Sequence, residues 1–260
     1  METQKPRKRF GQNFLHDPFI INRIIKSITP HPGDHFVEIG PGLGAITKPL
    51  INEIDELDVI EIDNNLAEEL QKKSWAKHIN VHLNDVLKFN FNEISDKSKS
   101  LRLIGNLPYN ISTPILFHFL NQLDIFIDIH VMLQKEVAKR IAAKPGNRDY
   151  GRLTVALSAH CNVELLFLIG PGAFNPAPSV ESAFTKLSPL EKPLVSSIEQ
   201  PIFDQIIRYA FGQRRKQLKN ALSGVISIDT IKAAQIDPEI RAENLHVEQY
   251  AELTKQHLKS

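Results

Sequence analysis

The stretch "VEIGPGLGAIT", residues 37–47, decides the fold of this chain. The apolar run that leads into it is typical of a buried strand, and it ends in Gly40, Gly42 and Gly44 before a stretch of helical character. Glycine permits a tight turn and lets a ligand approach the backbone, while the start of a helix offers free N–H groups. The pattern therefore predicts a nucleoside-binding turn at the end of the first strand of an α/β sheet.

Carboxylates end the next two predicted strands. Glu61 closes the run 57–63, about 20 residues beyond the turn, where an acid accepts hydrogen bonds from ribose hydroxyls. Asp85 closes the run 79–85 and either accepts a hydrogen bond from an adenine amino group or caps the next turn. Because the carboxyl ends of parallel strands converge, we expect both acids to lie beside the glycine turn.

The glycine turn by itself fits two ligands. Gly40, Gly42 and Ala45 also satisfy the dinucleotide pattern, so an NAD-linked oxidoreductase is one interpretation, which rests on the turn alone. Pro41 stiffens the turn, and Glu38 places an acid two residues before the first glycine. An acid there suits a sulfonium and an α-amino group better than a pyrophosphate, which favours S-adenosylmethionine.

Short apolar runs alternate with helix-period stretches through the first two-thirds of the chain. This alternation predicts an α/β fold, with a mostly parallel sheet covered by helices on both faces. The predicted strands are 35–40, 57–63, 79–85, 101–106 and 128–133, and 163–170 with 181–187 is expected to close the sheet as an antiparallel pair. The Pro- and Gly-rich segment 170–179 is predicted to be a loop.

The last quarter of the chain lacks strand signals. The segment 188–197 has the composition of a linker, so residues 1–190 are expected to form the main domain and residues 191–260 a small helical domain. Apolar residues from Ile207 to Leu222 recur at helical spacing and predict one amphipathic helix, and Asp229 is expected to cap a later helix.

The composition is that of an ordinary globular protein. Of 260 residues, 42% are hydrophobic and 23% are charged, and the formal net charge of +1 does not by itself indicate a polyanionic partner. The single cysteine, Cys161, excludes an intrachain disulfide and a cysteine-based zinc site, and no metal is expected. Since no apolar run approaches the ~20 residues that span a bilayer, and the start lacks a signal-peptide core, we expect a cytoplasmic protein without membrane contact.

The most specific motif is "NLPY", residues 106–109, at the end of the fourth predicted strand. An exocyclic adenine amine is a poor nucleophile because its lone pair is delocalised into the ring. Two acceptors for the amine protons would favour a tetrahedral nitrogen: Asn106 Oδ1 is one, and a backbone carbonyl, most simply that of Pro108, is the second. The ring of Tyr109 offers a stacking face worth about 1–3 kcal/mol, and in-line positioning supplies the rest of the catalysis.

A base must leave its stack to enter such a pocket, and a second aromatic wall would hold it there. Phe174 is the candidate, on a loop stiffened by Pro176 and Pro178. Taken alone, a phenylalanine in such a loop is more often a packing plug. Beside the NLPY motif, we expect it to stack on the base.

Motifs along nearly the whole chain make it resemble the KsgA-type ribosomal RNA small-subunit adenine dimethyltransferases. They are RFGQNFL, VEIGPGLG, VIEID, GNLPYNISTP, MLQKEVAKRI, YGRLTV, AFNPAPSVESA, QRRKQLKNAL and IDPEIRAENL. The resemblance implies a class I S-adenosylmethionine-dependent methyltransferase domain followed by a small helical domain. It also implies a monomer that dimethylates N6 of two adjacent adenines in a hairpin loop near the 3′ end of 16S rRNA, in the immature 30S subunit.

The resemblance also assigns roles to individual residues. The implied cofactor contacts are Asn13, Leu15, Gly40, Glu61, Asp85 and Asn106. The implied catalytic residues are Asn106, Pro108, Tyr109 and Phe174. The dimethylated product rests on the resemblance and does not follow from Asn106 alone.

Basic residues near the C-terminal end are the candidates for RNA contact. They are Arg208, Arg214, Arg215, Lys216 and Lys219, and a further basic run lies between Lys5 and Arg9. Arg208, Arg215 and Lys219 are expected on one side of the predicted helix, where a solvated surface is the alternative explanation. The resemblance to enzymes that act on a ribosomal subunit favours phosphate contacts.

Two other functions share these features. A methyltransferase of large-subunit rRNA has the same cofactor and amine motifs, but QRRKQLKNAL and IDPEIRAENL match the small-subunit group. An RNA-binding assembly factor would mainly occupy an immature subunit, with methylation secondary.

Overall fold

The computed structural model describes residues 12–95 and 98–260, so the basic run between Lys5 and Arg9 lies outside the described residues. The chain divides into two compact units. The first runs up to Ala138 and includes Glu164–Ser188, and the second consists of Lys139–Val163 and Pro189–Ser260. The second unit therefore contains residues 139–163 as well as the helical segment expected from residue 191.

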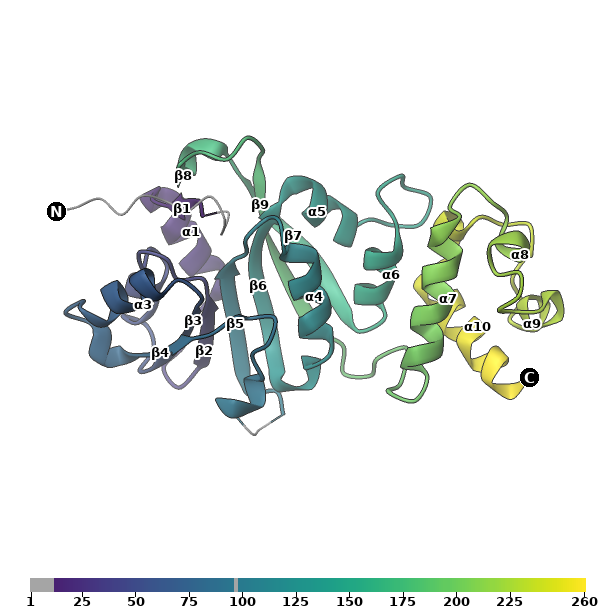
Figure 1. Ribbon diagram of the computed structural model, residues 1–260, viewed down its shortest axis with the longest axis horizontal. Helices are drawn as coiled ribbons and strands as arrows, with labels where there is room; N and C mark the ends of the chain where they lie inside the picture. The colour runs from purple at the N-terminus through teal and green to yellow at the C-terminus, as the bar shows by residue number, and fades with distance from the viewer. Residues whose placement is uncertain (1–11, 96–97) are drawn as a thin grey trace. The chain divides into compact units, whose positions relative to one another are not determined.

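A seven-stranded sheet forms the centre of the first unit, in the order β4-β3-β2-β5-β6-β9-β7 (Figure 1). Its strands are β2 (His35–Ile39), β3 (Leu57–Glu61), β4 (Ile79–Leu83), β5 (Leu101–Asn106), β6 (Phe126–Gln134), β7 (Cys161–Ile169) and β9 (Ser182–Pro189). The pairs among β4, β3, β2, β5 and β6 are parallel, and β9 is antiparallel to β6. The predicted mostly parallel sheet is confirmed.

The central strands are buried on both faces. Every residue of β3 is buried, as are the first five of the six residues of β5, which is the pattern of parallel strands covered by helices on both sides. Helix α1 (Pro18–Ile28) packs Ile24 and Ile28 into the same core cluster as Phe36. The other helices of the first two-thirds are α2 (Thr47–Leu50), α3 (Asn64–Gln71), α4 (Ser112–Leu120), α5 (Lys135–Ile141) and α6 (Arg152–Ser158).

A second, two-stranded sheet joins the start of the described chain to the segment 170–179. It consists of β1 (Phe14–Leu15) and β8 (Phe174–Asn175), which pair antiparallel with Leu15 opposite Phe174. The prediction that 170–179 is entirely a loop is therefore wrong. Two-residue strands carry no periodic pattern, and their pairing exists only when distant segments meet.

The second unit consists mainly of helices. It contains α6 within residues 139–163, and its further helices are α7 (Gln200–Gly212), α8 (Leu218–Ala221), α9 (Ile228–Ala233) and α10 (Val247–Lys259). The prediction of one helix through Leu222 is wrong, because α7 ends at Gly212 and the next residues form a bridge between Gln217 and Arg241. Asp229 does not cap α9, because Ser227 does so by accepting a hydrogen bond from the Thr230 N–H.

The segment 188–197 is anchored to the end of α6. The Leu190 N–H donates to the His160 carbonyl at 2.8 Å, and the Leu194 N–H donates to the Ala159 carbonyl at 2.9 Å. The side chain of Val195 is also buried. Through residues 12–95 and 98–260, no helix is both long and apolar enough to cross a bilayer.

Candidate active site

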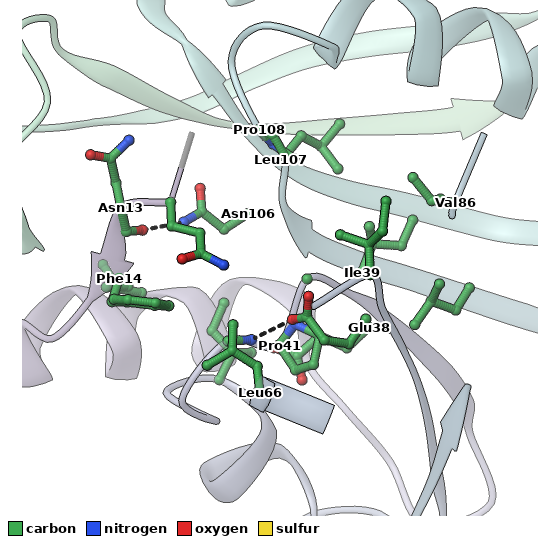
Figure 2. Close-up of a pocket in the computed structure, with 18 of the residues that line it drawn as sticks. Asn13, Phe14, Glu38, Ile39, Pro41, Leu66, Val86, Asn106, Leu107 and Pro108 are labelled. Atoms are coloured by element: carbon green, nitrogen blue, oxygen red, sulfur yellow. Dashed lines mark hydrogen bonds between the residues drawn. The ribbon is translucent and has the colours of Figure 1, made fainter. Parts of the chain in front are cut away.

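A pocket opens at the carboxyl ends of β2, β3, β4 and β5 (Figure 2). It brings together all but one of the residues predicted for cofactor binding and catalysis. These are Asn13, Leu15, Gly40, Glu61, Asp85, Asn106, Pro108 and Tyr109. Segments far apart in the sequence thus meet at one edge of the sheet, as the strand topology requires.

The glycine turn forms one wall of the pocket. Gly40 and Gly42 have φ angles of +62° and +57°, a region that side chains with a Cβ rarely adopt. A Cβ on Gly42 would also lie 3.0 Å from the ring of Phe14. The helix expected directly after the turn begins only at Thr47, so residues 42–46 form a further turn.

The Glu61 carboxylate is held in one orientation at the end of β3. Its Oε1 accepts from the Asp63 N–H at 2.9 Å, and its Oε2 accepts from the Gly42 N–H at 3.4 Å. The side chain is only 5% exposed, and this burial raises its pKa although the backbone N–H groups oppose the shift. The remaining lone pairs of both oxygens can accept from the hydroxyls of a bound nucleoside.

Glu38 is a second buried acid that lines the pocket. It is 2% exposed, and its Oε2 accepts from the Thr47 hydroxyl at 2.6 Å. Burial raises the pKa of Glu38 to about 7, with a smaller contribution in the same direction from the neighbouring Glu61 charge. A cation in the pocket would favour the ionised form of this carboxylate.

Asp85 takes the capping role considered for it and also lines the pocket. It lines the pocket, and its Oδ1 accepts from the Leu87 N–H at 3.0 Å, which caps the turn after β4. Its other carboxylate oxygen remains for a ligand. Ile62 and Asn84 also line this side of the pocket, and sequence reasoning missed both. The available signal was their position in the sequence, because Ile62 directly follows Glu61 and Asn84 directly precedes Asp85.

The Asn106 side chain is fixed by Asn13, a residue near the start of the described chain. Its Nδ2 donates to the main-chain carbonyl of Asn13 at 2.9 Å, drawn as a dashed line in Figure 2. With Nδ2 engaged there, Oδ1 is the amide atom left to accept a hydrogen bond from a ligand amine.

The Pro108 carbonyl is already an acceptor. It accepts from the Ile111 N–H at 3.2 Å in the turn that leads into α4. A carbonyl oxygen has two lone pairs, so this oxygen can take a second donor. Leu107 lines the pocket as well.

Tyr109 lines the pocket, and its hydroxyl contacts a residue that does not line it. The hydroxyl lies 2.5 Å from Oγ of Ser182, the first residue of β9. Burial raises the pKa of Tyr109, and the hydrogen bond to Ser182 opposes this shift. Sequence reasoning gave no role to Ser182, and the available signal was its place in the motif AFNPAPSVESA, residues 173–183.

The structure does not bring Phe174 into the pocket. Its side chain is 2% exposed and belongs to the core cluster that contains Leu15, Ile24 and Phe184. The cause is the pairing of β8 with β1, which places Phe174 opposite Leu15. In this conformation Phe174 is the packing residue that such a loop usually carries, and stacking on a base would require it to leave the core.

The basic residues predicted to bind RNA fall into two groups in the second unit. Arg214 pairs through Nε with Glu243 at 2.7 Å and donates to the Arg148 carbonyl, and Lys219 pairs with Glu239 at 2.7 Å. Arg208, Arg215 and Lys216 are exposed. Since α7 ends at Gly212, the expectation that Arg208, Arg215 and Lys219 share one helix face is wrong.

Among the described residues, no cluster of three or more His, Cys, Asp or Glu side chains is arranged to hold a metal ion.

Comparisons with known proteins all indicate one protein family. Residues 3–258 match the family model described as ribosomal RNA adenine dimethylase. The chain is 45% identical over 253 residues to ribosomal RNA small subunit methyltransferase A of Pseudomonas aeruginosa, covering 97% of this chain and 94% of that protein. It is 46% identical over 257 residues to the protein of the same name from Acinetobacter baylyi, covering 98% and 93%.

Solved structures agree with the fold. A dimethyladenosine transferase from Plasmodium falciparum matches with a TM-score of 0.81 and 25% identity, over 92% of this chain and 95% of that chain. The 23S rRNA methyltransferase ErmE shares the fold with a TM-score of 0.73 and 24% identity, over 94% and 99%. The first unit has the fold of the class I methyltransferases, and the chain belongs to the ribosomal RNA adenine dimethylase family.

Proposed function

We propose that this protein transfers methyl groups from S-adenosylmethionine to N6 of two adjacent adenines in a hairpin loop near the 3′ end of 16S rRNA. The substrate is the immature 30S subunit, the products are dimethyladenosines, and the role is in small-subunit biogenesis. One observation carries the proposal: a single pocket holds the glycine turn and Glu61 beside the motif Asn106–Tyr109. Membership of the adenine dimethylase family supports it.

The donor side of the pocket suits S-adenosylmethionine. The Glu61 carboxylate can accept from the ribose hydroxyls, and Asp85 can accept from the adenine amino group with the oxygen that its turn leaves unused. Asn13, Leu15 and Gly40 complete the proposed cofactor contacts. The buried acid Glu38 favours a positively charged ligand in this pocket.

The acceptor side suits an adenine amine. Asn106 Oδ1 and the carbonyl of Pro108 or Leu107 would accept the two amine protons, and Tyr109 would stack on the base. The amine lone pair then forms a bond to the methyl carbon while the bond from that carbon to sulfur breaks and sulfur keeps the electron pair. The proton leaves to water afterwards, because nitrogen becomes acidic once alkylated, and no general base is required.

The helical segment 191–260 is proposed to contact rRNA through its basic residues while residues 1–190 carry the chemistry. The exposed residues Arg208, Arg215 and Lys216 are the better candidates for phosphate contacts. Arg214 and Lys219 already pair with acids and would have to exchange partners. We propose that the protein acts as a monomer.

The test is incubation with labelled S-adenosylmethionine and unmethylated 30S subunits, followed by nucleoside analysis. We expect N6,N6-dimethyladenosine in 16S rRNA and none in a parallel reaction with 50S subunits. Label in the 50S reaction alone would identify a large-subunit enzyme. Tight 30S binding without methyl transfer would support an assembly factor, and binding of NAD in place of S-adenosylmethionine would contradict the proposed cofactor.

A further inference from the structure

We propose that Ser182 is a positioning residue for this methyl transfer: it holds the Tyr109 ring in the orientation that the target base stacks on. The inference rests on the proposed function, because it gives Tyr109 its task. It adds to that function a residue that lies outside the pocket and touches neither cofactor nor base.

The contact itself is short and partly buried. The Tyr109 hydroxyl and Ser182 Oγ are 2.5 Å apart, and they join positions separated by 73 residues. Ser182 is 0% exposed, whereas Tyr109 is half-buried and lines the pocket. The hydroxyl end of the ring is therefore held by the protein, and the ring is left for a ligand.

The strand that carries Ser182 gives it a fixed position. Ser182 pairs with Gln134 in the antiparallel ladder of β9 and β6. The preceding residue, Glu181, accepts from the Lys135 N–H at 2.9 Å and forms an ion pair with the Lys135 ammonium group. The start of β9 is thus attached to β6 and to Lys135, the residue that follows β6.

The backbone of Tyr109 is fixed by other bonds. The Ser112 hydroxyl donates to the Tyr109 carbonyl at 3.2 Å, and the Leu107 N–H donates to the Met132 carbonyl at 3.2 Å. Only the two side-chain torsions of Tyr109 remain free, and the second of them has a broad, shallow preference. The bond to Ser182 fixes the position of the hydroxyl oxygen and so sets the first torsion, and it restrains the second because a phenol O–H prefers to lie in the plane of its ring.

A stacking face is most useful when it is in place before the base arrives. A ring that must first be ordered spends part of the stacking energy on that ordering, and small errors of geometry lower the rate of an in-line transfer. Loss of the Ser182 hydroxyl should therefore slow methylation while the cofactor still binds.

The experiment compares Ser182→Ala, Tyr109→Phe and the double variant, with 30S subunits and labelled S-adenosylmethionine. Each single variant should lower kcat about tenfold and leave the Kd for S-adenosylmethionine within about twofold. The double variant should be no slower than the slower single variant, because both remove the same hydrogen bond.

Thr185→Val is the matched control. Thr185 lies on the same strand, is equally buried, and donates from its hydroxyl to the Val131 carbonyl at 2.9 Å. Val keeps the shape and removes that bond at a position that does not touch Tyr109. It should lower Tm about as much as Ser182→Ala and leave kcat within about twofold.

Ring mobility provides a readout besides activity. The chain has four tyrosines, so 3-fluorotyrosine labelling gives a simple fluorine NMR spectrum in which Tyr109→Phe identifies the Tyr109 signal. In Ser182→Ala this signal should shift and show faster ring motion, whereas Thr185→Val should leave it in place.

The inference is overturned if wild-type protein methylates 30S subunits and Ser182→Ala keeps full kcat. Equal losses of kcat in Ser182→Ala and Thr185→Val, or additive losses in the double variant, would overturn it as well. If wild-type protein transfers no methyl group, the proposed function fails instead. In that case an unchanged Tyr109 signal in Ser182→Ala would overturn the anchoring of the ring separately.

Discussion

Asn106 Nδ2 donates a hydrogen bond to the main-chain carbonyl of Asn13 at 2.9 Å, across 93 positions of the sequence. The bond ties the end of β5 to the segment that enters β1. Both residues line the pocket, and each belongs to a different motif of the family resemblance. The amide proposed to be catalytic and one edge of the proposed cofactor site are therefore a single hydrogen-bonded unit.

Two substitutions at Asn106 should separate its two contacts. Asn106→Ala removes both the Oδ1 acceptor and the Nδ2 donor to Asn13, and it should lower kcat by at least about 100-fold. Asn106→Asp keeps acceptor oxygens but cannot donate to Asn13, and its carboxylate would face a carbonyl oxygen. We expect it to weaken S-adenosylmethionine binding about tenfold as well, measured by calorimetry. The exposed Asn52→Ala is the control, and normal cofactor affinity in Asn106→Asp would contradict the bond's importance.

Glu38 should make stability depend on pH. Its pKa is raised from 4.5 to about 7 by burial, so the folded state binds more protons than the unfolded state between these values. The free energy of unfolding should thus fall by about 3 kcal/mol as pH rises from about 4.5 to 7. Glu38→Gln should lose this decrease and be more stable than wild type at pH 8, as urea denaturation can show.

The same carboxylate should affect cofactor binding in the opposite direction. Above pH 7 Glu38 is mostly ionised and attracts a cationic ligand, so wild-type affinity for S-adenosylmethionine should rise through pH 7. Glu38→Gln should show a flatter profile and weaker binding at pH 8. If affinity for S-adenosylmethionine changes with pH in the same way in both proteins, the charge of Glu38 does not contribute to binding of the cation.

His130 is expected to destabilise the fold at acid pH. Its ring is 1% exposed and stacks on Phe184, and both ring nitrogens lack a hydrogen-bond partner among the described residues. Burial lowers its pKa from 6.5 to about 4, and the Asp128 charge opposes the shift only in part. The unfolded state therefore binds the proton first, and stability should fall by about 3 kcal/mol as pH drops from 6.5 to 4.

Replacement of the ring tests this account. His130→Leu removes two unsatisfied polar atoms at nearly constant volume and should stabilise the protein by about 1–2 kcal/mol at pH 7. It should also remove the loss of stability toward pH 4. A destabilised His130→Leu protein would indicate that packing of the imidazole on Phe184 outweighs its desolvation.

Phe174 should behave as a core residue. Phe174→Ala would leave a cavity between β8 and the core cluster and should lower stability by about 3–5 kcal/mol, whereas Phe174→Leu should cost less than about 1.5 kcal/mol. If Phe174 only packs, Phe174→Leu should keep kcat within about twofold. A stable Phe174→Leu protein with a large loss of kcat would instead show that the ring leaves the core to stack on the base.

The basic residues of the second unit should contribute differently to 30S binding, depending on whether each is exposed or already paired with an acid. Substitution of the exposed Arg215 and Lys216 by Ala should weaken 30S binding and reduce the slope of log affinity against log salt by about 2. The exposed pair Lys232 and Lys255, changed to Ala in the same unit, is the matched control.

Arg214→Ala should give a different result. It breaks the pair with Glu243 and the bond to the Arg148 carbonyl, so it should lower Tm and change the salt slope little. The slope of log affinity against log salt could instead fall as far in Arg214→Ala as in the variant at Arg215 and Lys216. That result would show that Arg214 leaves Glu243 to contact a phosphate.

The sequence alone determined the sheet and the position of the site. Strands such as β3 and β5 are short apolar runs buried on both faces, and glycine sterics mark the turn after β2, so both signals are local. Because parallel strands end at one edge, the sequence predicts that Glu61, Asp85 and Asn106 lie together, and all three line one pocket.

Only the tertiary structure decided what each side chain faces. The pairing of Leu15 with Phe174, the anchoring of Tyr109 by Ser182, and the pairing of Arg214 with Glu243 all join distant segments. The end of α7 at Gly212 likewise depends on the bridge that follows it, because the apolar spacing continues through the break. Local preferences act over a few residues, whereas burial and hydrogen bonding between remote segments are properties of the folded chain.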